Sequence, residues 1–347
     1  MIKEISIKNF KSIVDLKLDM GRVNVLIGAN GCGKTNILEA IALASGACQN
    51  KLDDEFLGAR LRLTEPGFMV SEFGETESEK GLIDITVNEE NKPTFLCSMR
   101  YDSIESKWID EVEINNNYRK SEFLEKISKS VASFLIFSPE ETNLRKFSDD
   151  TMIRPLGRRG EGMFKHLRDL LTNGDKEKII HELNDGLSLL DWFKGFGIPK
   201  DLFTQEARLE ISDRYLNEAK QVFDQRSTNE GFLYLLFYLT LFNSEKTPSF
   251  FAIDNIETSL NPKLTKRLLH HLVKVAKEKE KQVIITTHSP YVLDGLDLSD
   301  DEQRLFVVRR NIDGHTRISR VPHKENRKNP LSEVWMSGVL GGLPDNF

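Results

Sequence analysis

The chain has 347 residues, enough for one large domain or two of ordinary size. Its 48 basic and 54 acidic residues leave a formal net charge of −6, which excludes a polycation and confines any nucleic-acid contact to a local patch. The three cysteines are scattered and odd in number, which favours a reducing compartment over a disulfide framework.

The N-terminal residues predict two short strands. Ile2–Ile7 and Val14–Leu18 alternate between apolar and polar residues, so we expect a hairpin, and the start of the chain lacks the pattern of a signal peptide. Between the strands, Lys11 and Ser12 lie either near the phosphate-binding loop described next or in a solvated turn. The longest apolar run, Phe232–Phe242, is shorter than the roughly 20 residues of a membrane span, so we expect a soluble cytoplasmic protein with no membrane partner.

Gly28–Thr35 matches G-x-x-x-x-G-K-[ST], the motif of a phosphate-binding loop. The flanking residues support the match, because Val23–Ile27 predicts a buried strand and Asn36–Leu43 predicts a helix that Gly46 is placed to end. Backbone N–H groups of such a loop surround phosphate oxygens, and the helix N-terminus adds its positive end.

The side chains of this region supply the remaining contacts to a nucleotide. Lys34 is placed to reach the β- and γ-phosphates, and the hydroxyl of Thr35 is placed to ligate Mg²⁺. We expect the following residues to contact the nucleotide: Asn30, Gly31, Cys32, Gly33, Lys34, Thr35, Asn36, Lys11 and Ser12.

The residues after this helix predict a β-rich segment. Lys51–Lys80 is polar and acidic, which is typical of a surface insertion. Leu82–Val87, Thr94–Met99 and Lys107–Ile114 are strand-like and are separated by polar turns, so we expect a small antiparallel sheet. Val131–Phe137 is a continuous apolar run, which predicts a strand of a sheet buried on both faces.

The next stretch, Asn143–Leu216, is mostly helical in pattern and has no heptad repeat long enough for a coiled coil. Its one tight basic cluster, Arg154, Arg158 and Arg159, is either a solvated face or a contact to a phosphate or a partner. Ser227–Gly231 then introduces the apolar helix noted above. Capping residues followed by glycine form either an anion site at a helix N-terminus or an ordinary capped core helix.

Two strands in the C-terminal half end in residues that suit a nucleotide site. Ser249–Asp254 is apolar and ends in aspartate, the acidic partner that a phosphate-binding loop needs for Mg²⁺. Asn261 and Pro262 predict the start of a helix. Gln282–Thr287 follows as a buried strand and delivers His288. A lone histidine is more often structural, but the carboxyl edge of such strands is where nucleotide sites form, which favours a functional role.

The end of the chain predicts a hairpin and an apolar segment. Arg304–Arg309 and Thr316–Val321 are joined through an Asp-Gly turn. The basic segment Lys324–Lys328 precedes Leu331–Phe347, which is apolar and rich in glycine. We expect this last segment to dock on the body of the protein or on a partner.

Taken in order, these motifs resemble the ABC-type ATPase heads of the structural-maintenance-of-chromosomes (SMC) and recombination-repair family. They are more similar to the short AAA-family ATPases of the overcoming-lysogenisation-defect (OLD) class, many of which occur in bacterial anti-phage systems. The resemblance implies an α/β fold, a P-loop NTPase head with a mixed β-sheet, a small antiparallel β arm and a helical insertion. A single head would span residues 1–347, with residues 51–130 as the β-rich arm and residues 144–224 as the helical subdomain.

The resemblance also implies roles for individual residues. Asn9–Ser12 matches the N-terminal signature, and Phe137–Glu140 occupies the Q-loop position without its glutamine. The residues expected to hold Mg²⁺ are Thr35, Asp254 and Glu140. The ABC signature, which acts on the nucleotide of a second copy, is matched in part by Asn229, Glu230 and Gly231. The D-loop is matched by Ser259 and Leu260. The catalytic residues implied are Asn255, Glu257 and His288, the last as the switch histidine.

The chain departs from the family pattern in two ways. Asp254 is followed by Asn255, where the family usually has glutamate. Asparagine can hydrogen-bond a water but cannot accept its proton, so we expect slow hydrolysis, with Glu257 as a candidate replacement base. The chain also has no long coiled-coil arms and no room for an added nuclease domain, so we expect it to act through another polypeptide.

Three functions remain open, all with ATP and Mg²⁺ as the implied cofactors. The first is a nucleotide-switched ATPase that forms a homodimer or higher homo-oligomer around ATP and controls a separately encoded effector, expected to be a nuclease, in phage defence. The second is a DNA-binding repair ATPase, with nucleic acid as partner, against which the net charge counts. The third is an ATP-binding scaffold with little hydrolysis, which Asn255 favours.

Overall fold

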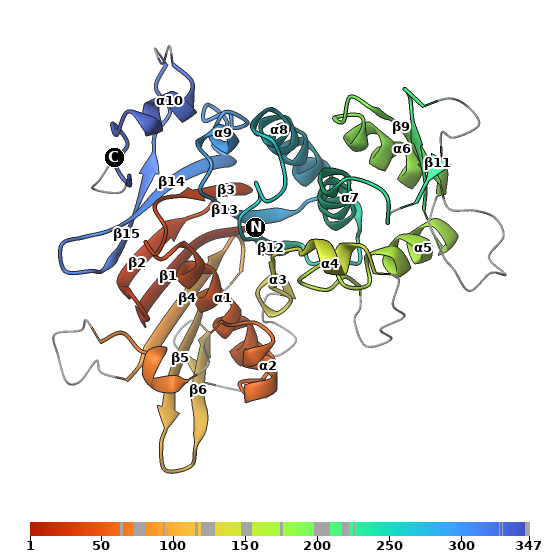
Figure 1. Ribbon diagram of the computed structural model, residues 1–347. Coiled ribbons are helices and arrows are strands. Elements are labelled where there is room, and N and C mark those ends of the chain that lie inside the picture. Colours follow the sequence, from red (N-terminus) through yellow and green to blue (C-terminus); the bar gives the residue numbers. More distant parts are fainter. Residues whose placement is uncertain are drawn as a thin grey trace. The chain divides into compact units, whose positions relative to one another are not determined.

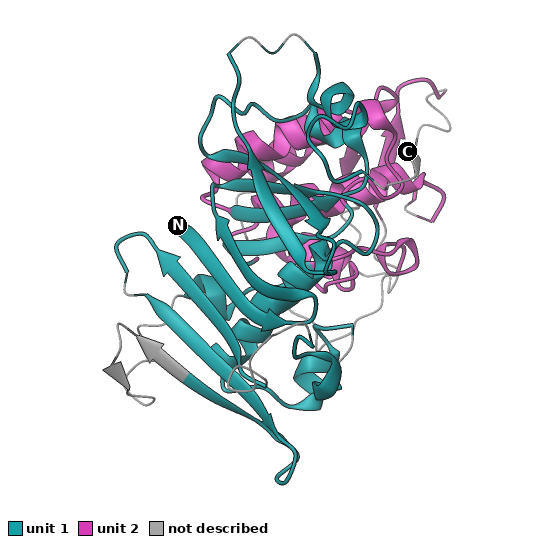
Figure 2. Cartoon of the chain, turned by 90° about the vertical axis from the view of Figure 1, so that its left-hand side faces the viewer, with its two compact units in different colours: residues 1–136, 248–255, 282–347 teal, residues 137–247, 256–281 magenta. Residues whose placement is uncertain are grey.

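The computed structural model describes residues 1–62, 65–72, 81–92, 94–114, 117–118, 129–146, 155–173, 176–197, 209–216, 222–224, 226–325, 327 and 329–343. They form two compact units (Figure 2). Unit 1 comprises residues 1–136, 248–255 and 282–347, and unit 2 comprises residues 137–247 and 256–281. Arg154, Lys328 and parts of the segments 51–130, 144–224 and 331–347 lie outside the described residues.

Unit 1 contains a mixed sheet with the strand order β15-β14-β3-β13-β12-β8 (Figure 1). Its centre is parallel: β3 (Val23–Ile27) lies between β13 (Gln282–Thr287) and β14 (Gln303–Arg310), and β12 (Phe250–Ile253) follows beyond β13. Every residue of β3, β12 and β13 is buried, as expected for apolar strands covered on both faces. Because these strands are parallel, the residues that follow them gather at one edge of the sheet.

The second sheet of unit 1 is antiparallel, with the order β2-β1-β4-β5-β6-β7. Its strands are β1 (Ile2–Phe10), β2 (Ile13–Asp19), β4 (Ile83–Glu89), β5 (Phe95–Asp102), β6 (Lys107–Ile114) and β7 (Asn117–Tyr118). The expected hairpin and the expected antiparallel sheet are confirmed. The pairing of β1 with β4 joins them into one sheet, with Ile5 opposite Val87 and Ile7 opposite Ile85.

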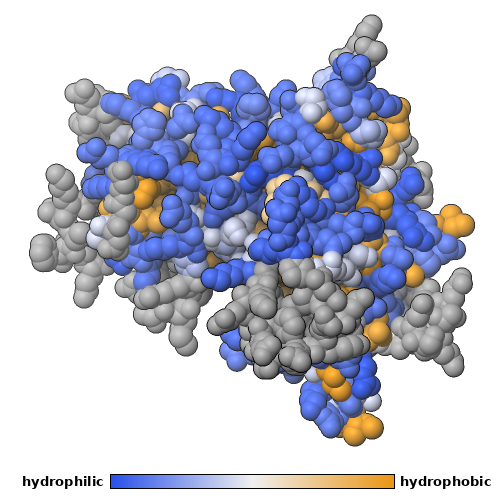
Figure 3. Space-filling model, turned by 180° about the vertical axis from the view of Figure 1, so that it is seen from behind, coloured by the Kyte–Doolittle hydropathy of each residue, from blue (hydrophilic) through white to orange (hydrophobic). Residues whose placement is uncertain are grey.

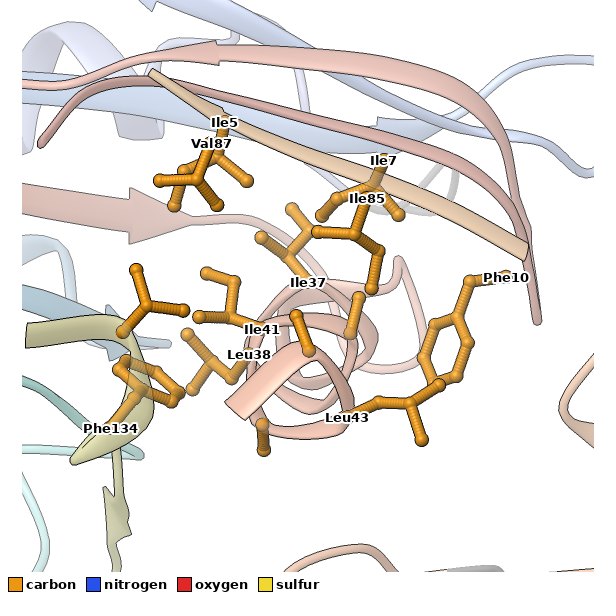
Figure 4. Close-up of a cluster of buried hydrophobic side chains, with 14 of the residues drawn as sticks. Ile5, Ile7, Phe10, Ile37, Leu38, Ile41, Leu43, Ile85, Val87 and Phe134 are labelled. Carbon is orange, nitrogen blue, oxygen red and sulfur yellow. The ribbon is translucent and has the colours of Figure 1, made fainter. Parts of the chain in front are cut away.

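The main core of unit 1 lies between this sheet and helix α1 (Lys34–Cys48) (Figure 4). Side chains from β1 and β4 point toward Ile37 and Ile41 of the helix. The helix continues through Gly46, so the expectation that Gly46 ends it is wrong. A Cβ at Gly46 would lie 2.8 Å from the carbonyl oxygen of Lys51, so the glycine serves close packing against the segment that leads into α2 (Asp54–Gly58).

The apolar run Val131–Phe137 does not form one strand, as the sequence suggests. Helix α3 (Lys129–Ala132) takes its first residues, and β8 covers only Ile136–Phe137. Phe134, between them, is fully buried and packs 4.8 Å from Phe250 between ring centroids. A short apolar run reports burial, but its pattern alone does not separate a strand from a buried helical turn.

Unit 2 is built around helices. They are α4 (Glu141–Leu144), α5 (Met163–Asn173), α6 (Lys176–Leu187), α7 (Glu230–Asn243) and α8 (Pro262–Glu278). Every residue from Phe232 to Phe242 is buried, so the expected core helix is confirmed. The stretch expected to be mostly helical contains α5, α6 and the end of α4, in agreement with the expectation, and it also contains short strands that its pattern does not indicate. They are β9 (Phe193–Gly197) and β10 (Glu210–Asp213), which form a sheet with β11 (Val222–Phe223).

The remaining elements of unit 1 are β15 (Thr316–Val321), the short helices α9 (Pro290–Leu293) and α10 (Leu331–Met336), and the 3₁₀ turn Pro66–Phe68. The face shown in Figure 3 is mostly hydrophilic, with apolar residues in separate small areas. Among the described residues, no helix combines the length and apolar character needed to cross a membrane.

Candidate nucleotide-binding site

The phosphate-binding loop connects β3 to α1 in unit 1. Gly31 and Gly33 have φ values of 74° and 106°, which L-residues with side chains adopt only with strain. A Cβ at Gly33 would also lie 2.1 Å from the hydroxyl oxygen of Thr316, and one at Gly28 would lie 2.1 Å from the carbonyl oxygen of Val308. Backbone conformation and close approach therefore both require glycine in this loop.

Lys34 is the first residue of α1, and it is only 5% exposed. Its ammonium donates to the carbonyl oxygens of Gly28 and Ala29 at 2.7 and 3.1 Å, and it lies 3.2 Å from Nδ1 of His288. The buried ammonium is thus held at the inner side of the loop, between the end of β3 and the end of β13. An anionic phosphate at this place would receive charge-assisted hydrogen bonds.

Thr35 and Asp254 bring hydroxyl and carboxylate oxygens together beside the loop. The Thr35 hydroxyl donates to Oδ2 of Asp254 at 3.2 Å, and the Thr286 hydroxyl donates to Oδ1 of the same carboxylate. Such hard oxygen donors suit Mg²⁺, which usually takes one or two protein ligands and completes its shell with phosphate and water. Among the described residues, no cluster of three or more His, Cys, Asp or Glu side chains suited to a metal occurs.

Asn255 follows Asp254 and adopts a left-handed conformation, with φ of 56°. Its backbone N–H donates to the Thr286 hydroxyl at 2.9 Å, so the same threonine orients both Asp254 and Asn255. Asparagine accepts this conformation more readily than most residues, because its short polar side chain can bond locally. Thr286 was not among the residues that the motifs indicate, although a polar residue in the apolar strand before His288 is a usable signal.

Lys11 and Ser12 both lie against the start of α1. The Lys11 ammonium lies 2.7 Å from Oε2 of Glu39, and Ser12 accepts a hydrogen bond from the Asn36 side chain at 2.8 Å. Burial alone would raise the pKa of Glu39, but the charge of Lys11 and hydrogen bonds from Lys11 and Arg62 hold that pKa below its ordinary value. Ser12 is buried, so a fully solvated turn is excluded for it.

The hairpin of β14 and β15 supports the outer side of the loop. Thr316 donates to the carbonyl oxygen of Cys32 at 3.0 Å and lies 2.7 Å from the Ser12 hydroxyl, and Arg310 donates to the carbonyl oxygen of Gly31 at 2.9 Å. Neither residue belongs to a recognisable motif. They reach the loop only because β14 pairs with β3 and places the hairpin beside it.

The signature and D-loop residues belong to unit 2 and are brought together there. Asn229 caps α7 by accepting from the N–H of Phe232 at 2.9 Å, and the Glu230 carboxylate accepts from the Ser259 hydroxyl at 2.7 Å. With Gly231 they line one cavity of about 690 Å³. A Cβ at Gly231 would have its nearest neighbour, Oδ1 of Asn229, at 3.5 Å, so a methyl group would fit here in ordinary van der Waals contact.

The other expected site residues of unit 2 are each held locally. The N–H of Leu260 donates to the carbonyl oxygen of Glu257 at 3.0 Å, which closes a turn before α8. The Glu140 carboxylate lies 3.3 Å from Nε of Arg159. The backbone N–H of Glu140 donates to the carbonyl oxygen of Arg159 at 3.0 Å. Two members of the basic cluster, Arg158 and Arg159, thus hold the Q-loop segment through their backbone carbonyls.

Comparison with known proteins gives both family and fold. The family described as "AAA domain, putative AbiEii toxin, Type IV TA system" matches residues 23–294. The DNA replication and repair protein RecF of Heliobacterium modesticaldum is 27% identical over 231 residues, 64% of this chain and 56% of that protein. The OLD nuclease of Thermus scotoductus is 44% identical over 46 residues, 13% of this chain and 9% of that protein. The chain thus matches little more than half the length of the RecF relative.

Solved structures with the same fold include two SMC heads. An SMC head bound to the C-terminal winged-helix domain of ScpA has a TM-score of 0.64 at 18% identity, with 92% of this chain and 98% of that chain covered. The SMC head domain of Thermotoga maritima has a TM-score of 0.54 at 18% identity, with 93% and 99% covered. The expected ABC-type head fold is confirmed, and because the family match spans most of the chain, the chain belongs to this family of AAA-domain ATPases.

Proposed function

We propose that the chain binds ATP with Mg²⁺ at the loop Gly28–Thr35 and hydrolyses it slowly. The observation that carries the proposal is the convergence of Lys34, Thr35, Asp254 and His288 at the carboxyl edge of β3, β12 and β13. Lys34 would hold the β- and γ-phosphates, and Thr35 and Asp254 would hold the metal ion. When bound there, Mg²⁺ supplies positive charge that offsets the charge of the phosphate oxygens.

Slow turnover follows from the residue after Asp254. The Asn255 amide can orient an attacking water but cannot take its proton, and general-base assistance is typically worth about 10²–10⁴-fold. His288 would contact the γ-phosphate from the end of β13. Glu257 is the candidate to replace the missing base.

The second part of the proposal is assembly around the nucleotide. The N-terminus of α7, with Asn229, Glu230 and Gly231, would meet the γ-phosphate held by Lys34 of a second copy, because helix N-termini bind anions. ATP would then favour the dimer more than ADP, which lacks that phosphate.

The third part is control of a separately encoded effector, a nuclease, in defence against phage. It is supported by the similarity to an OLD nuclease and by the family description, which names a putative toxin of a toxin–antitoxin system. The test is to purify the chain together with the protein encoded beside it, with and without ATP, and to assay nuclease activity. Failure of the two proteins to associate in either state would contradict this part.

A DNA-repair ATPase is the second candidate, because the RecF relative matches 64% of the chain. The two candidates differ in what stimulates turnover. A repair ATPase should be stimulated by duplex DNA, with affinity that falls steeply as salt rises. An effector-controlling ATPase should respond to its protein partner instead.

A further inference from the structure

We propose that the C-terminal segment Leu331–Leu343, here called the strap, positions Lys34 for nucleotide binding. The proposal rests on the proposed ATP-binding function and adds residues that no motif contains. The strap consists of α10 and the glycine-rich residues after it, all within unit 1. One end is held by Asp294, shortly after His288 in the chain, and the other end contacts the phosphate-binding loop.

The first end is tied to the segment that follows His288. The N–H and hydroxyl of Ser332 donate to the two carboxylate oxygens of Asp294 at 2.9 and 2.7 Å. Asp294 follows directly after α9, which begins two residues beyond His288. Trp335 of α10 is 8% exposed, so the helix buries this side chain against the rest of the protein. This end of the strap is therefore anchored and is not a frayed terminus.

The second end contacts the phosphate-binding loop. The carbonyl oxygen of Gly342 accepts a hydrogen bond from the N–H of Ala29 at 3.2 Å. That N–H belongs to the same peptide group as the carbonyl of Gly28, which accepts from the Lys34 ammonium at 2.7 Å. In a trans peptide the N–H and the C=O point in opposite directions. The carbonyl of Gly342 and the ammonium of Lys34 therefore hydrogen-bond to opposite ends of one peptide group.

This geometry gives the strap a specific task. If the carbonyl of Gly342 withdraws, the peptide between Gly28 and Ala29 can rotate and the Lys34 ammonium loses a fixed acceptor. Hydrogen bonds at the two ends of an amide also polarise each other, so losing one weakens the other. The strap thus preorganises the ammonium at the place where the phosphates bind.

The position of Gly342 depends on its lack of a side chain. Its φ is +79°, and a Cβ would lie 2.5 Å from Cγ1 of Val307, a buried residue of β14. Gly342→Ala should therefore lift the carbonyl away from Ala29. Gly81 is the matched control, because its φ is +98° but no atom of the described residues lies within 4 Å of its Cβ position. Gly81→Ala adds similar backbone strain without moving the strap.

The first arm of the test needs no nucleotide. Amide hydrogen exchange is measured at Ala29 in the parent, Gly342→Ala and Gly81→Ala. We expect exchange at Ala29 to be at least about tenfold faster in Gly342→Ala, because the protecting acceptor is lost, and unchanged in Gly81→Ala. Equal exchange in the parent and Gly342→Ala would overturn the proposal.

The second arm measures ATP affinity in a double-mutant cycle with Lys34→Ala. Gly342→Ala should weaken binding about fivefold when Lys34 is present, and should have no further effect when Lys34 is already alanine. A purely structural strap would give the same loss in both backgrounds, which would overturn the proposal. If the parent binds no ATP, the proposed function fails, and exchange at Ala29 still decides whether the strap holds the loop.

Discussion

Lys34 is the residue on which the candidate site depends most. Two backbone carbonyls and the His288 ring hold its ammonium inside the loop. We predict that Lys34→Ala weakens ATP binding at least tenfold, about 1.4 kcal/mol, because charge-assisted phosphate contacts are lost. A binding titration measures this, with Lys17→Ala as the control, since Lys17 is exposed on β2. Parent-like affinity of Lys34→Ala would contradict the site.

Asn255 gives a second prediction at the residue scale. Asn255→Glu supplies a carboxylate at the position of the missing base and should raise the steady-state rate by about tenfold or more. The gain is limited because glutamate tolerates the φ of 56° less well than asparagine. Asn255→Gln carries the same strain without a base and should not be faster. If the parent is already fast and the glutamate variant is no faster, Glu257 becomes the base to test.

The sequence predicts those site residues that belong to contiguous motifs. The phosphate-binding motif identifies Lys34 and Thr35, and the apolar strand before Asp254 identifies that residue. These residues lie close together because the strands that precede them run parallel in one sheet. Thr316 and Gly342 lie about 300 residues from the loop that they contact. Their contacts depend on pairing and packing that no local pattern encodes, so the sequence does not indicate them.

Helices α5 and α7 of unit 2 share a buried polar contact, in which His166 lies 2.9 Å from the Ser244 hydroxyl at the end of α7. Burial, helped by the charge of Lys246, lowers the pKa of His166 to about 4 from 6.5. The unfolded chain therefore binds more protons between about pH 4 and pH 6.5. We predict that the free energy of unfolding falls as pH falls through this window, by at most about 3 kcal/mol.

Denaturant unfolding at a series of pH values measures this dependence. His166→Gln can keep a hydrogen bond to Ser244 but cannot gain the proton, so its curve should be flatter between pH 4 and 6.5. His181→Gln is the matched control, since His181 is exposed on α6. An unchanged slope in His166→Gln would assign the acid sensitivity to other groups.

At the scale of elements, the sequence predicts best where one pattern persists. Helices α7 and α8 have long apolar patterns and a capping asparagine, and both begin within two residues of the expected position. The strands β9 and β10 are short and contain glycine and polar residues. Their patterns are therefore too brief to be recognised within a stretch whose overall pattern is helical. The elements that the sequence predicts correctly are thus those whose apolar pattern extends over many residues, whereas short patterns are easily misassigned.

The prediction for the whole molecule concerns its mass. If two copies close on ATP, light scattering should give a larger mass with ATP·Mg²⁺ than with ADP·Mg²⁺ or without nucleotide. Gly231→Arg should block closure by bulk and leave ATP binding to one copy nearly intact. Gly195→Arg is the control within unit 2, because its Cβ position has no atom within 4 Å in the part of the chain that the structure describes. A mass that never depends on nucleotide would contradict the assembly model.

The order of strands in the mixed sheet also bears on how the protein matures during synthesis. Strand β3 emerges early from the ribosome, but both of its neighbours, β13 and β14, lie more than 250 residues further along the chain. Pairing across such separations is slow to nucleate, because a long loop must close first. The nascent chain therefore carries the complete sequence of the phosphate-binding loop long before it has the sheet that shapes the loop. We therefore expect a chain that is truncated before β13 to lack a formed phosphate-binding loop.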